Sequence, residues 1–149
     1  MTDHCGFYWV LKGRLAGAAY PTECLDWLYH KQGIRALVSL EPLAPDEARR
    51  AIRLGFELAN APITDFTPGT LGQRQAALTH IDRFLERGLP TLVHCKGGLG
   101  RTGMILAIYL VTHMDLDPQA AIKSIRRLRS RSIELPEQTD AVYDAARSD

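Results

Sequence analysis

The sequence lacks the features that mark several classes of protein. It contains no internal repeat and no Gly/Ser-rich linker, so we expect a single domain over residues 1–149. Its longest strongly apolar run covers only 104–111, whereas a helix that crosses a bilayer needs about 20 residues. Charge of one sign is not in excess either, because 18 Lys and Arg stand against 17 Asp and Glu. We therefore expect neither a membrane nor a nucleic acid as partner.

The start of the chain lacks a secretion signal. Asp3 stands where a signal peptide carries basic residues, and no apolar segment follows it. We therefore expect a cytoplasmic protein.

Cysteine is scarce. Cys5, Cys24 and Cys95 are odd in number and show no CxxC spacing, so the pattern predicts neither a disulfide framework nor a zinc site. Cys5 and Cys24 are interpreted as packing residues, and no disulfide from either of them to Cys95 is expected. Cys95 is either an inert buried thiol or a reactive thiolate, and its surroundings decide which.

What the chain does contain is an alternation of strand and helix patterns. Strands are expected at 7–11, 14–16, 36–40, 56–63 and 91–94. Helices are expected at 22–32, 45–54, 71–87 and 101–113, with two more that begin near Pro118 and Pro136. This alternation predicts an α/β sheet flanked by helices, with the last helices packed on one side.

The most informative segment is 93–103, which reads Val-His-Cys-Lys-Gly-Gly-Leu-Gly-Arg-Thr-Gly between an expected strand and an expected helix. Glycines at 97, 98 and 100 let the backbone curl with its N–H groups inward, where a β-branched residue would clash. Such a nest, closed by a helix N-terminus, binds anions the size of phosphate. The same positive field stabilises a thiolate at Cys95, and the planar guanidinium of Arg101 can bind two phosphate oxygens. The predicted phosphate-binding loop comprises Lys96, Gly97, Gly98, Leu99, Gly100 and Arg101.

This segment resembles the signature loop of the protein tyrosine phosphatases, His-Cys-x5-Arg-Ser/Thr-Gly, with every fixed position filled. The resemblance extends to Trp-Val-Leu-x-Gly-Arg-Leu-Ala-Gly at 9–17, Val-Ser-Leu at 38–40 and Ile-Arg-Arg-Leu-Arg at 125–129. These segments are similar to those of the compact dual-specificity phosphatases related to VHZ and of the small archaeal tyrosine phosphatases. The resemblance implies a central, mostly parallel mixed sheet between helices. One departure lies at 130–131, where relatives usually have Pro-Gly and this chain has Ser-Arg.

The resemblance also implies roles for individual residues. Cys95 would attack phosphorus to give a cysteinyl-phosphate, with Arg101 and the loop amides on the equatorial oxygens and no cofactor or metal. Asp65, in a segment like the family's general-acid loop, would protonate the leaving oxygen and then activate water; Thr64 replaces the usual proline there. The alternative is that Asp65 only caps a turn.

Three further residues have implied roles with plainer alternatives. Thr102 would hydrogen-bond the sulfur, or it is an ordinary residue of the first helical turn. His94 would orient the loop through hydrogen bonds, much as a satisfied core histidine would. Gln138 would place the hydrolytic water, or it is an exposed polar residue at a helix start. A basic cluster would attract phosphorylated substrates or form a solvated helix face, and it comprises Lys123, Arg126, Arg127, Arg129 and Arg131.

We predict a monomeric phosphatase that acts on phosphotyrosine in proteins, with phosphoserine and phosphothreonine as further candidates. A phosphoinositide phosphatase is the first alternative, since tensin-related lipid phosphatases also have a lysine where this chain has Lys96; they have a second lysine at Leu99. A phosphate-binding module without turnover is the second, and the intact Cys95, Arg101 and Asp65 argue against it. A dinucleotide site is disfavoured although 98–103 matches G-x-G-x-x-G, because no second parallel strand is expected after the helix.

Overall fold

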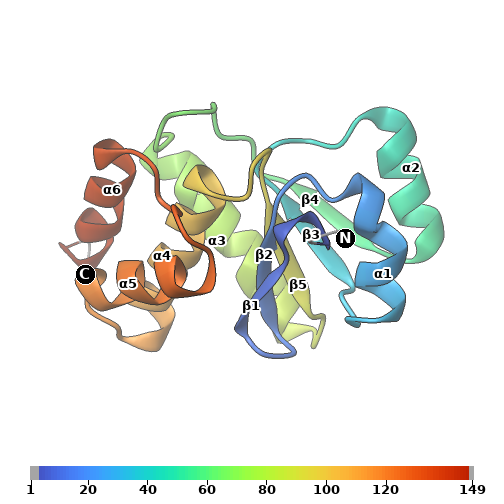
Figure 1. Ribbon diagram of the computed structural model, residues 1–149, viewed down its shortest axis with the longest axis horizontal. Coiled ribbons are helices and arrows are strands. Elements are labelled where there is room, and N and C mark those ends of the chain that lie inside the picture. Colours follow the sequence, from blue (N-terminus) through green and yellow to red (C-terminus); the bar gives the residue numbers. More distant parts are fainter. Residues whose placement is uncertain (1–3, 148–149) are drawn as a thin grey trace.

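The computed structural model describes residues 4–147, which fold into a five-stranded sheet with helices on both faces (Figure 1). The strands are β1 (Tyr8–Leu11), β2 (Leu15–Ala18), β3 (Ala36–Ser39), β4 (Glu57–Asn60) and β5 (Thr91–His94). The helices are α1 (Leu25–His30), α2 (Pro45–Leu54), α3 (Leu71–Glu86), α4 (Gly100–Met114), α5 (Pro118–Leu128) and α6 (Pro136–Arg147). Two short 3-10 helices, η1 (His4–Gly6) and η2 (Thr22–Cys24), precede α1. The predicted α/β class is confirmed.

The sheet is mixed and mostly parallel. Its strand order is β1-β2-β5-β3-β4, and only the edge strand β1 runs antiparallel to its neighbour. In the parallel pair at the centre, Ser39 of β3 is in register with His94 of β5. The carboxyl ends of β3, β4 and β5 therefore meet at one edge of the sheet, where α/β folds bind their ligands.

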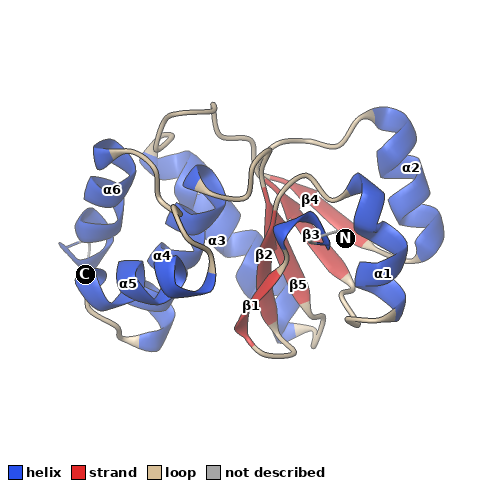
Figure 2. Cartoon of the chain, in the orientation of Figure 1, coloured by secondary structure: helices blue, strands red, loops and turns tan. Residues whose placement is uncertain are grey.

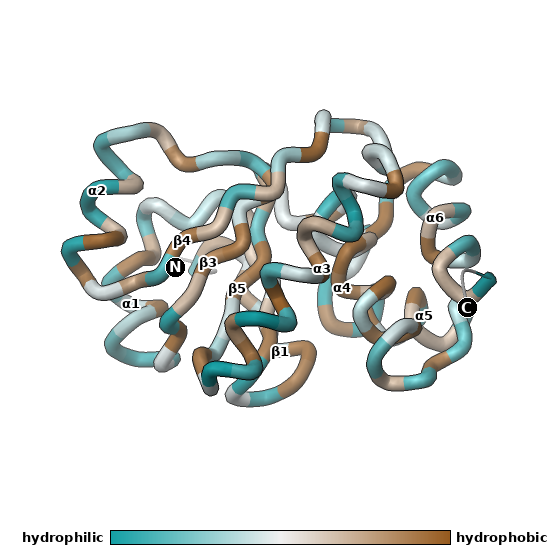
Figure 3. Tube along the Cα trace, turned by 180° about the vertical axis from the view of Figure 1, so that it is seen from behind, coloured by the Kyte–Doolittle hydropathy of each residue, from teal (hydrophilic) through white to brown (hydrophobic). Residues whose placement is uncertain are grey.

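Two apolar layers hold the helices to the sheet. Figure 2 shows the strands between two groups of helices, with α1 and α2 on one side and α3 to α6 on the other. The larger layer contains α4, whose residues from Gly100 to Val111 are all buried, and the smaller one lies under α1 and α2. In Figure 3 the most hydrophobic stretches run through the central strands and α4. The apolar run 104–111 is thus a core helix, and within residues 4–147 no helix is long and apolar enough to cross a membrane.

The helix predicted at 22–32 is wrong in its bounds. A 3-10 turn, η2, precedes α1, and the side chain of Thr22 caps neither helix. The helix ends at His30, where the N–H groups of Lys31 and Gln32 both donate to the carbonyl oxygen of Trp27 and the regular i to i−4 pattern stops. Gly33 then takes a left-handed conformation with φ 77° and directs the chain into β3.

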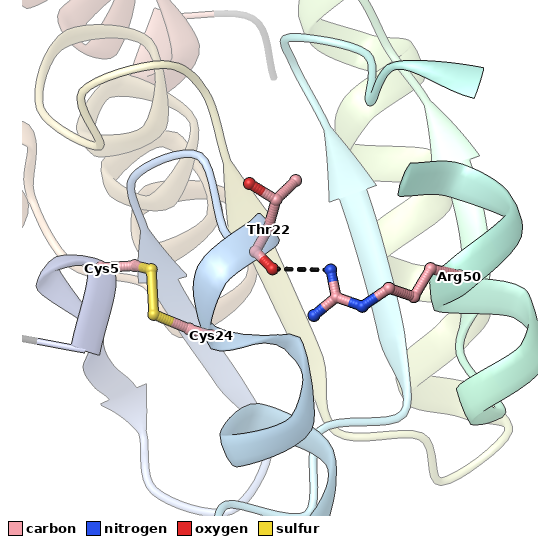
Figure 4. Close-up of a disulfide and its surroundings, with 4 residues drawn as sticks. All are labelled: Cys5, Thr22, Cys24 and Arg50. Atoms are coloured by element: carbon pink, nitrogen blue, oxygen red, sulfur yellow. Dashed lines mark hydrogen bonds between the residues drawn. A yellow bond between two sulfur atoms is a disulfide. The ribbon is translucent and has the colours of Figure 1, made fainter. Parts of the chain in front are cut away.

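Cys5 and Cys24 form a disulfide, which corrects their interpretation as separate packing residues (Figure 4). The bridge joins η1 to η2, and the two helices meet only in the folded chain, so the spacing of 19 residues carried no signal. Next to it, Arg50 of α2 donates to the carbonyl oxygen of Thr22 at 2.9 Å. Among the described residues, Cys95 is the free cysteine, and it is buried.

Candidate active site

Cys95 directly follows the central strand β5 and is 2% exposed. The N–H of Gly98 donates to its Sγ atom at 3.2 Å, so the loop curls back over the sulfur. Gly98 has φ 74°, and a Cβ atom there would lie 2.6 Å from the backbone nitrogen of Ala19. Only glycine fits this position, because both the backbone angle and the contact exclude a side chain.

The other loop glycines differ from one another. A Cβ on Gly100 would lie 2.9 Å from Oε1 of Glu134, whereas Gly97 has nothing within 4 Å of that position. A Cβ atom therefore fits at Gly97, and the predicted clash of a β-branched residue there stays a prediction. Helix α4 begins at Gly100, and no side chain caps its first turn. The free N–H groups of that turn make the end of α4 next to Cys95 electropositive.

Arg101 is buried, with 2% of its side chain exposed. Its Nη1 donates to the carbonyl oxygen of Ile63 and to Oε1 of Glu41, both at 2.8 Å, and lies 3.5 Å from the carbonyl oxygen of Leu40. Its Nε and Nη2 have no hydrogen-bond partner within residues 4–147. These two atoms form one edge of the guanidinium, which is the edge that binds an oxyanion in bidentate fashion.

Asp65 lies beside that edge. Its Oδ1 is 3.3 Å from Nη2 of Arg101, and it also accepts the N–H of Phe66 at 2.9 Å. The carboxylate therefore both caps its own turn and pairs with the arginine. At 44% exposure it is open to solvent, in contrast to the buried guanidinium. The bond to Phe66 agrees with the turn-capping interpretation, and the role of Asp65 as an acid stays a prediction.

His94 connects β3 to the start of the phosphate-binding loop. Its Nε2 is 2.6 Å from Oγ of Ser39, and its Nδ1 is 3.2 Å from the carbonyl oxygen of Cys95. A carbonyl only accepts, so Nδ1 carries the proton and Nε2 accepts from the Ser39 hydroxyl. Burial lowers the pKa of His94 to about 4, so the ring is neutral near pH 7.

Comparisons with known proteins identify the family of this domain. Residues 4–142 match the family described as Swiss Army Knife protein, DSP-PTPase phosphatase domain. The chain belongs to this dual-specificity phosphatase family. It is a phosphoric monoester hydrolase.

Three relatives show how far the similarity reaches. The crystal structure of Tk-PTP in the active form superposes with a TM-score of 0.85 at 27% identity, over 97% of this chain and 98% of that one. The human phosphatidylglycerophosphatase and protein-tyrosine phosphatase 1 is 30% identical over 92% of this chain and 80% of its own length. The Arabidopsis thaliana phosphatidylglycerophosphate phosphatase PTPMT1 is 38% identical over 46% of this chain, which spans only 20% of that protein.

Two further predicted residues of this dual-specificity phosphatase domain, Thr102 and Gln138, lie next to the phosphate-binding loop. Oγ1 of Thr102 is buried and has no hydrogen-bond partner within residues 4–147, so the predicted bond to the sulfur of Cys95 is not made in this structure. Gln138 is 1% exposed, which makes the interpretation as an exposed helix-start residue wrong. Its Nε2 donates to the carbonyl oxygen of Thr67 at 3.3 Å, so it joins α6 to the loop that carries Asp65.

The structure adds residues that the sequence interpretation missed. A cleft of about 350 Å³ opens over the cysteine, and it is lined by Asp65, Phe66, Cys95, Lys96, Gly97, Leu99, Gly100, Arg101 and Glu134. Phe66 at this cleft is 66% exposed, and Glu41 orients Arg101 from outside the cleft. Glu41 could have been found, because it follows the predicted strand 36–40, whose end meets that of β5 at the ligand edge of the sheet. The position of Glu134 depends on a loop shape that the sequence did not indicate.

The dinucleotide interpretation has no support in the topology. The glycine segment 98–103 leads into α4, and α4 is followed by α5 rather than by a second parallel strand. The segment therefore lacks the βαβ unit that dinucleotide binding requires.

Proposed function

We propose that this enzyme hydrolyses phosphotyrosine in proteins through a cysteinyl-phosphate intermediate. The observation that carries the proposal is the buried edge of Arg101. Nε and Nη2 make no hydrogen bond within residues 4–147, and Nη2 has only the ion pair with Asp65 at 3.3 Å, while three acceptors hold Nη1 in place. A buried donor without a partner is costly unless a ligand satisfies it, and an oxyanion beside Cys95 would satisfy both donors.

The first step forms a bond between Sγ of Cys95 and phosphorus and breaks the bond from phosphorus to the tyrosyl oxygen. A proton from Asp65 goes to that oxygen, so the leaving group departs as a neutral phenol. The substrate phosphate takes the Nη2 position that Asp65 faces at 3.3 Å, which frees the carboxyl group to reach the leaving oxygen. The loop amides and Arg101 stabilise the charge on the equatorial oxygens.

The second step regenerates the thiolate. Asp65 takes a proton from water, the water oxygen attacks phosphorus, and the bond between phosphorus and sulfur breaks. The unpaired Thr102 hydroxyl would donate to the departing sulfur. Gln138 would steady the Asp65 loop through Thr67 as water enters.

Phe66 favours phosphotyrosine over shorter phosphoesters. Its ring is largely exposed on the wall of the cleft, next to the proposed acid. An aromatic leaving group above Cys95 would pack against this ring, whereas serine and threonine have none to offer.

The test is hydrolysis of para-nitrophenyl phosphate by the purified protein and by Cys95→Ser. We expect turnover by the wild type and its loss in the variant, because a hydroxyl is a much weaker nucleophile than a thiolate. Equal rates in the two proteins would refute the proposal.

A lipid phosphate is the second candidate substrate. The human and plant relatives carry names that specify phosphatidylglycerophosphate hydrolysis. Comparing kcat/KM for a phosphotyrosine peptide, a phosphoserine peptide and phosphatidylglycerophosphate in vesicles separates the candidates. We expect the phosphotyrosine peptide to be the best substrate, and a preference for the lipid would replace our proposal with the second candidate.

A further inference from the structure

Tyr20 lies in the segment between β2 and η2, beside the start of the phosphate-binding loop. Its N–H donates to the carbonyl oxygen of Lys96 at 3.0 Å. Its ring packs edge-on against the ring of His94, with the two centroids 5.8 Å apart and an interplanar angle of 78°. The backbone and the ring of this half-buried tyrosine are therefore both attached to the loop that carries Cys95.

The hydroxyl group of Tyr20 contacts a different part of the chain. It accepts the N–H of Ala44 at 2.9 Å and lies 3.4 Å from the carbonyl oxygen of Pro42, to which it donates. One hydroxyl thus uses both its donor and an acceptor position on the segment 41–44, which leads from β3 into α2. Tyr20 therefore ties this segment to the phosphate-binding loop.

The segment 41–44 also holds the guanidinium of Arg101. Oε1 of Glu41 accepts from Nη1 of Arg101 at 2.8 Å, and Glu41 directly precedes Pro42 in the chain. The side chain of Glu41 is 41% exposed, so packing constrains it little and the position of its backbone decides where the carboxylate lies. A residue that fixes the backbone at Pro42 therefore also fixes the carboxylate that orients Arg101.

We propose that Tyr20 is a positioning residue of the phosphatase, which aligns the guanidinium of Arg101 with the phosphate-binding loop by holding Glu41. The proposal rests on the proposed function in one respect, that Arg101 binds the phosphate of the substrate. Bidentate binding of a phosphate requires the guanidinium plane and the loop amides to be in register, so a tie between their two supports improves affinity. Tyr20 is not among the residues that line the cleft over Cys95, so it acts through Glu41 and not on the substrate.

The first variant is Tyr20→Phe, which keeps the ring against His94 and removes only the hydroxyl. We expect KM for para-nitrophenyl phosphate and the inhibition constant of inorganic phosphate each to rise about fivefold. The value of kcat should change little, because Arg101 binds the phosphoryl oxygens in the bound substrate as well as in the transition state. The melting temperature should stay within about 2 °C of the wild type, since the freed groups of Pro42 and Ala44 belong to exposed residues and can bond to water.

Tyr143→Phe is the matched control. Tyr143 is an exposed residue of α6 that does not line the cleft over Cys95, so the same hydroxyl is removed away from the site. We expect this variant to keep the wild-type KM and inhibition constant. Unchanged constants in Tyr20→Phe, or an equal rise in Tyr143→Phe, would overturn the proposal. A fall in kcat of Tyr20→Phe with no change in the inhibition constant would overturn it as well.

A double-mutant cycle tests whether Tyr20 acts through Glu41. Glu41→Ala removes the carboxylate that accepts from Arg101, so it should raise the same two constants. In that background Tyr20→Phe should add less than a twofold effect, because the group that Tyr20 positions is already absent. If the effects of the two substitutions instead multiply, Tyr20 supports the site by a route that does not include Glu41, and the proposal is wrong.

Binding separates the role of Tyr20 from the proposed function. Calorimetry of Cys95→Ser with inorganic phosphate measures the affinity of the site without turnover. An enzyme that hydrolyses no phosphotyrosine peptide, but whose Cys95→Ser form loses about fivefold in phosphate affinity on Tyr20→Phe, would refute the proposed function and support the role of Tyr20. Hydrolysis of the peptide with no effect of Tyr20→Phe on this affinity would support the function and refute the role. Failure of Cys95→Ser to bind phosphate would refute the role of Tyr20.

Discussion

At the scale of single residues, the site is defined by which atoms of Arg101 have partners. Nη1 is held by a carboxylate and two backbone carbonyls, so the guanidinium plane does not depend on substrate for its orientation. On the remaining edge, Nη2 lies 3.3 Å from Oδ1 of Asp65. Substrate binding therefore requires an exchange of one anion for another, and it couples phosphate recognition to release of the proposed acid.

The first prediction concerns Asp65. Asp65→Asn keeps the size of the side chain but cannot supply a proton, so we expect kcat to fall about 100-fold on phenyl phosphate. The loss should be much smaller with para-nitrophenyl phosphate, because its leaving oxygen needs little protonation. Asp46→Asn, at an exposed carboxylate on α2, is the control and should behave as the wild type. Unchanged turnover of phenyl phosphate in Asp65→Asn would exclude Asp65 as the acid.

The second prediction concerns His94, whose pKa burial lowers from 6.5 to about 4. Above pH 6.5 the ring is neutral in the folded and unfolded states, and its neutral form contributes fully to stability. Between pH 6.5 and 4 only the unfolded state binds the proton, so the free energy of unfolding falls as the pH falls, by about 2 kcal/mol between pH 7 and 5.

Urea unfolding at pH 7 and pH 5 measures this loss. We expect His94→Asn to lose less stability than the wild type over that interval, and His30→Asn, at an exposed histidine, to lose as much as the wild type. The same loss in all three proteins would show that His94 is not the titrating group.

The chemistry-bearing residues were predictable from the sequence to different degrees. The spacing of Cys95, Arg101 and Thr102 indicated a phosphate loop because glycines and a helix start are local features. Glu41 and Glu134 come from elements distant in sequence, and the packing of β3, β5 and the loop before α6 brings Glu41 to Arg101 and Glu134 to the cleft over Cys95. The requirement for glycine at position 98 likewise depends on its close approach to the backbone of Ala19, which the spacing of residues in the sequence does not reveal.

At the scale of elements, local signals explain both the correct and the wrong predictions. Helix α2 has the predicted bounds 45–54 because Pro45 fits its first turn and Gly55, with φ 117°, ends it. The segment 22–32 offered similar signals, yet a 3-10 turn and an early C-terminus shortened the helix. Strand β4 ends at Asn60, short of the predicted 63, and Pro62 has no N–H for a continued ladder.

The loop from Thr64 to Thr70 is held from within and from α3. Thr67 Oγ1 donates to the carbonyl oxygen of Thr64 at 2.7 Å. Arg74 Nη1 donates to the carbonyl oxygens of Pro68 and Gly69 at 3.1 and 2.8 Å. These bonds brace the loop, in which Thr64 stands at the position of the proline that the resemblance leads one to expect.

The third prediction follows from that bracing. Arg74→Ala removes both bonds, so Asp65 should be positioned less well and kcat on phenyl phosphate should fall about fivefold. Arg83→Ala, at an exposed arginine of the same helix, should leave kcat unchanged. Steady-state kinetics of both variants on phenyl and para-nitrophenyl phosphate provide the test, since a loss of acid function is larger on the first ester. Equal losses on both esters would contradict a role through Asp65.

At the scale of the whole molecule, the disulfide connects the start of the chain to the support of the site. Cys24 ends η2, and η2 is linked to α2 by the bond from Arg50 to Thr22 (Figure 4). In the segment just before η2, the N–H of Tyr20 donates to the carbonyl oxygen of Lys96 at 3.0 Å. The bridge therefore limits the movement of a segment that packs directly on the phosphate loop.

The fourth prediction is that reduction of this bridge lowers the melting temperature. Closing a loop of 19 residues restricts the unfolded chain by roughly 3 kcal/mol, so we expect a fall of about 10 °C. Calorimetry of the wild type with and without dithiothreitol measures it. The double variant Cys5→Ser/Cys24→Ser should melt like the reduced wild type and should not respond to the reductant. Equal melting temperatures of oxidised and reduced wild type would show that the bridge does not stabilise the fold.

The most direct test of the account is to trap the phosphoryl group on the protein. Wild type turning over para-nitrophenyl phosphate is quenched in acid within the first turnovers, digested and examined by mass spectrometry. We predict one phosphoryl group on the peptide that contains Cys95, absent from Cys95→Ser and more abundant in Asp65→Asn, where hydrolysis of the intermediate is slowed. Turnover without any phosphorylated Cys95 peptide, or with the phosphoryl group on another residue, would contradict the mechanism.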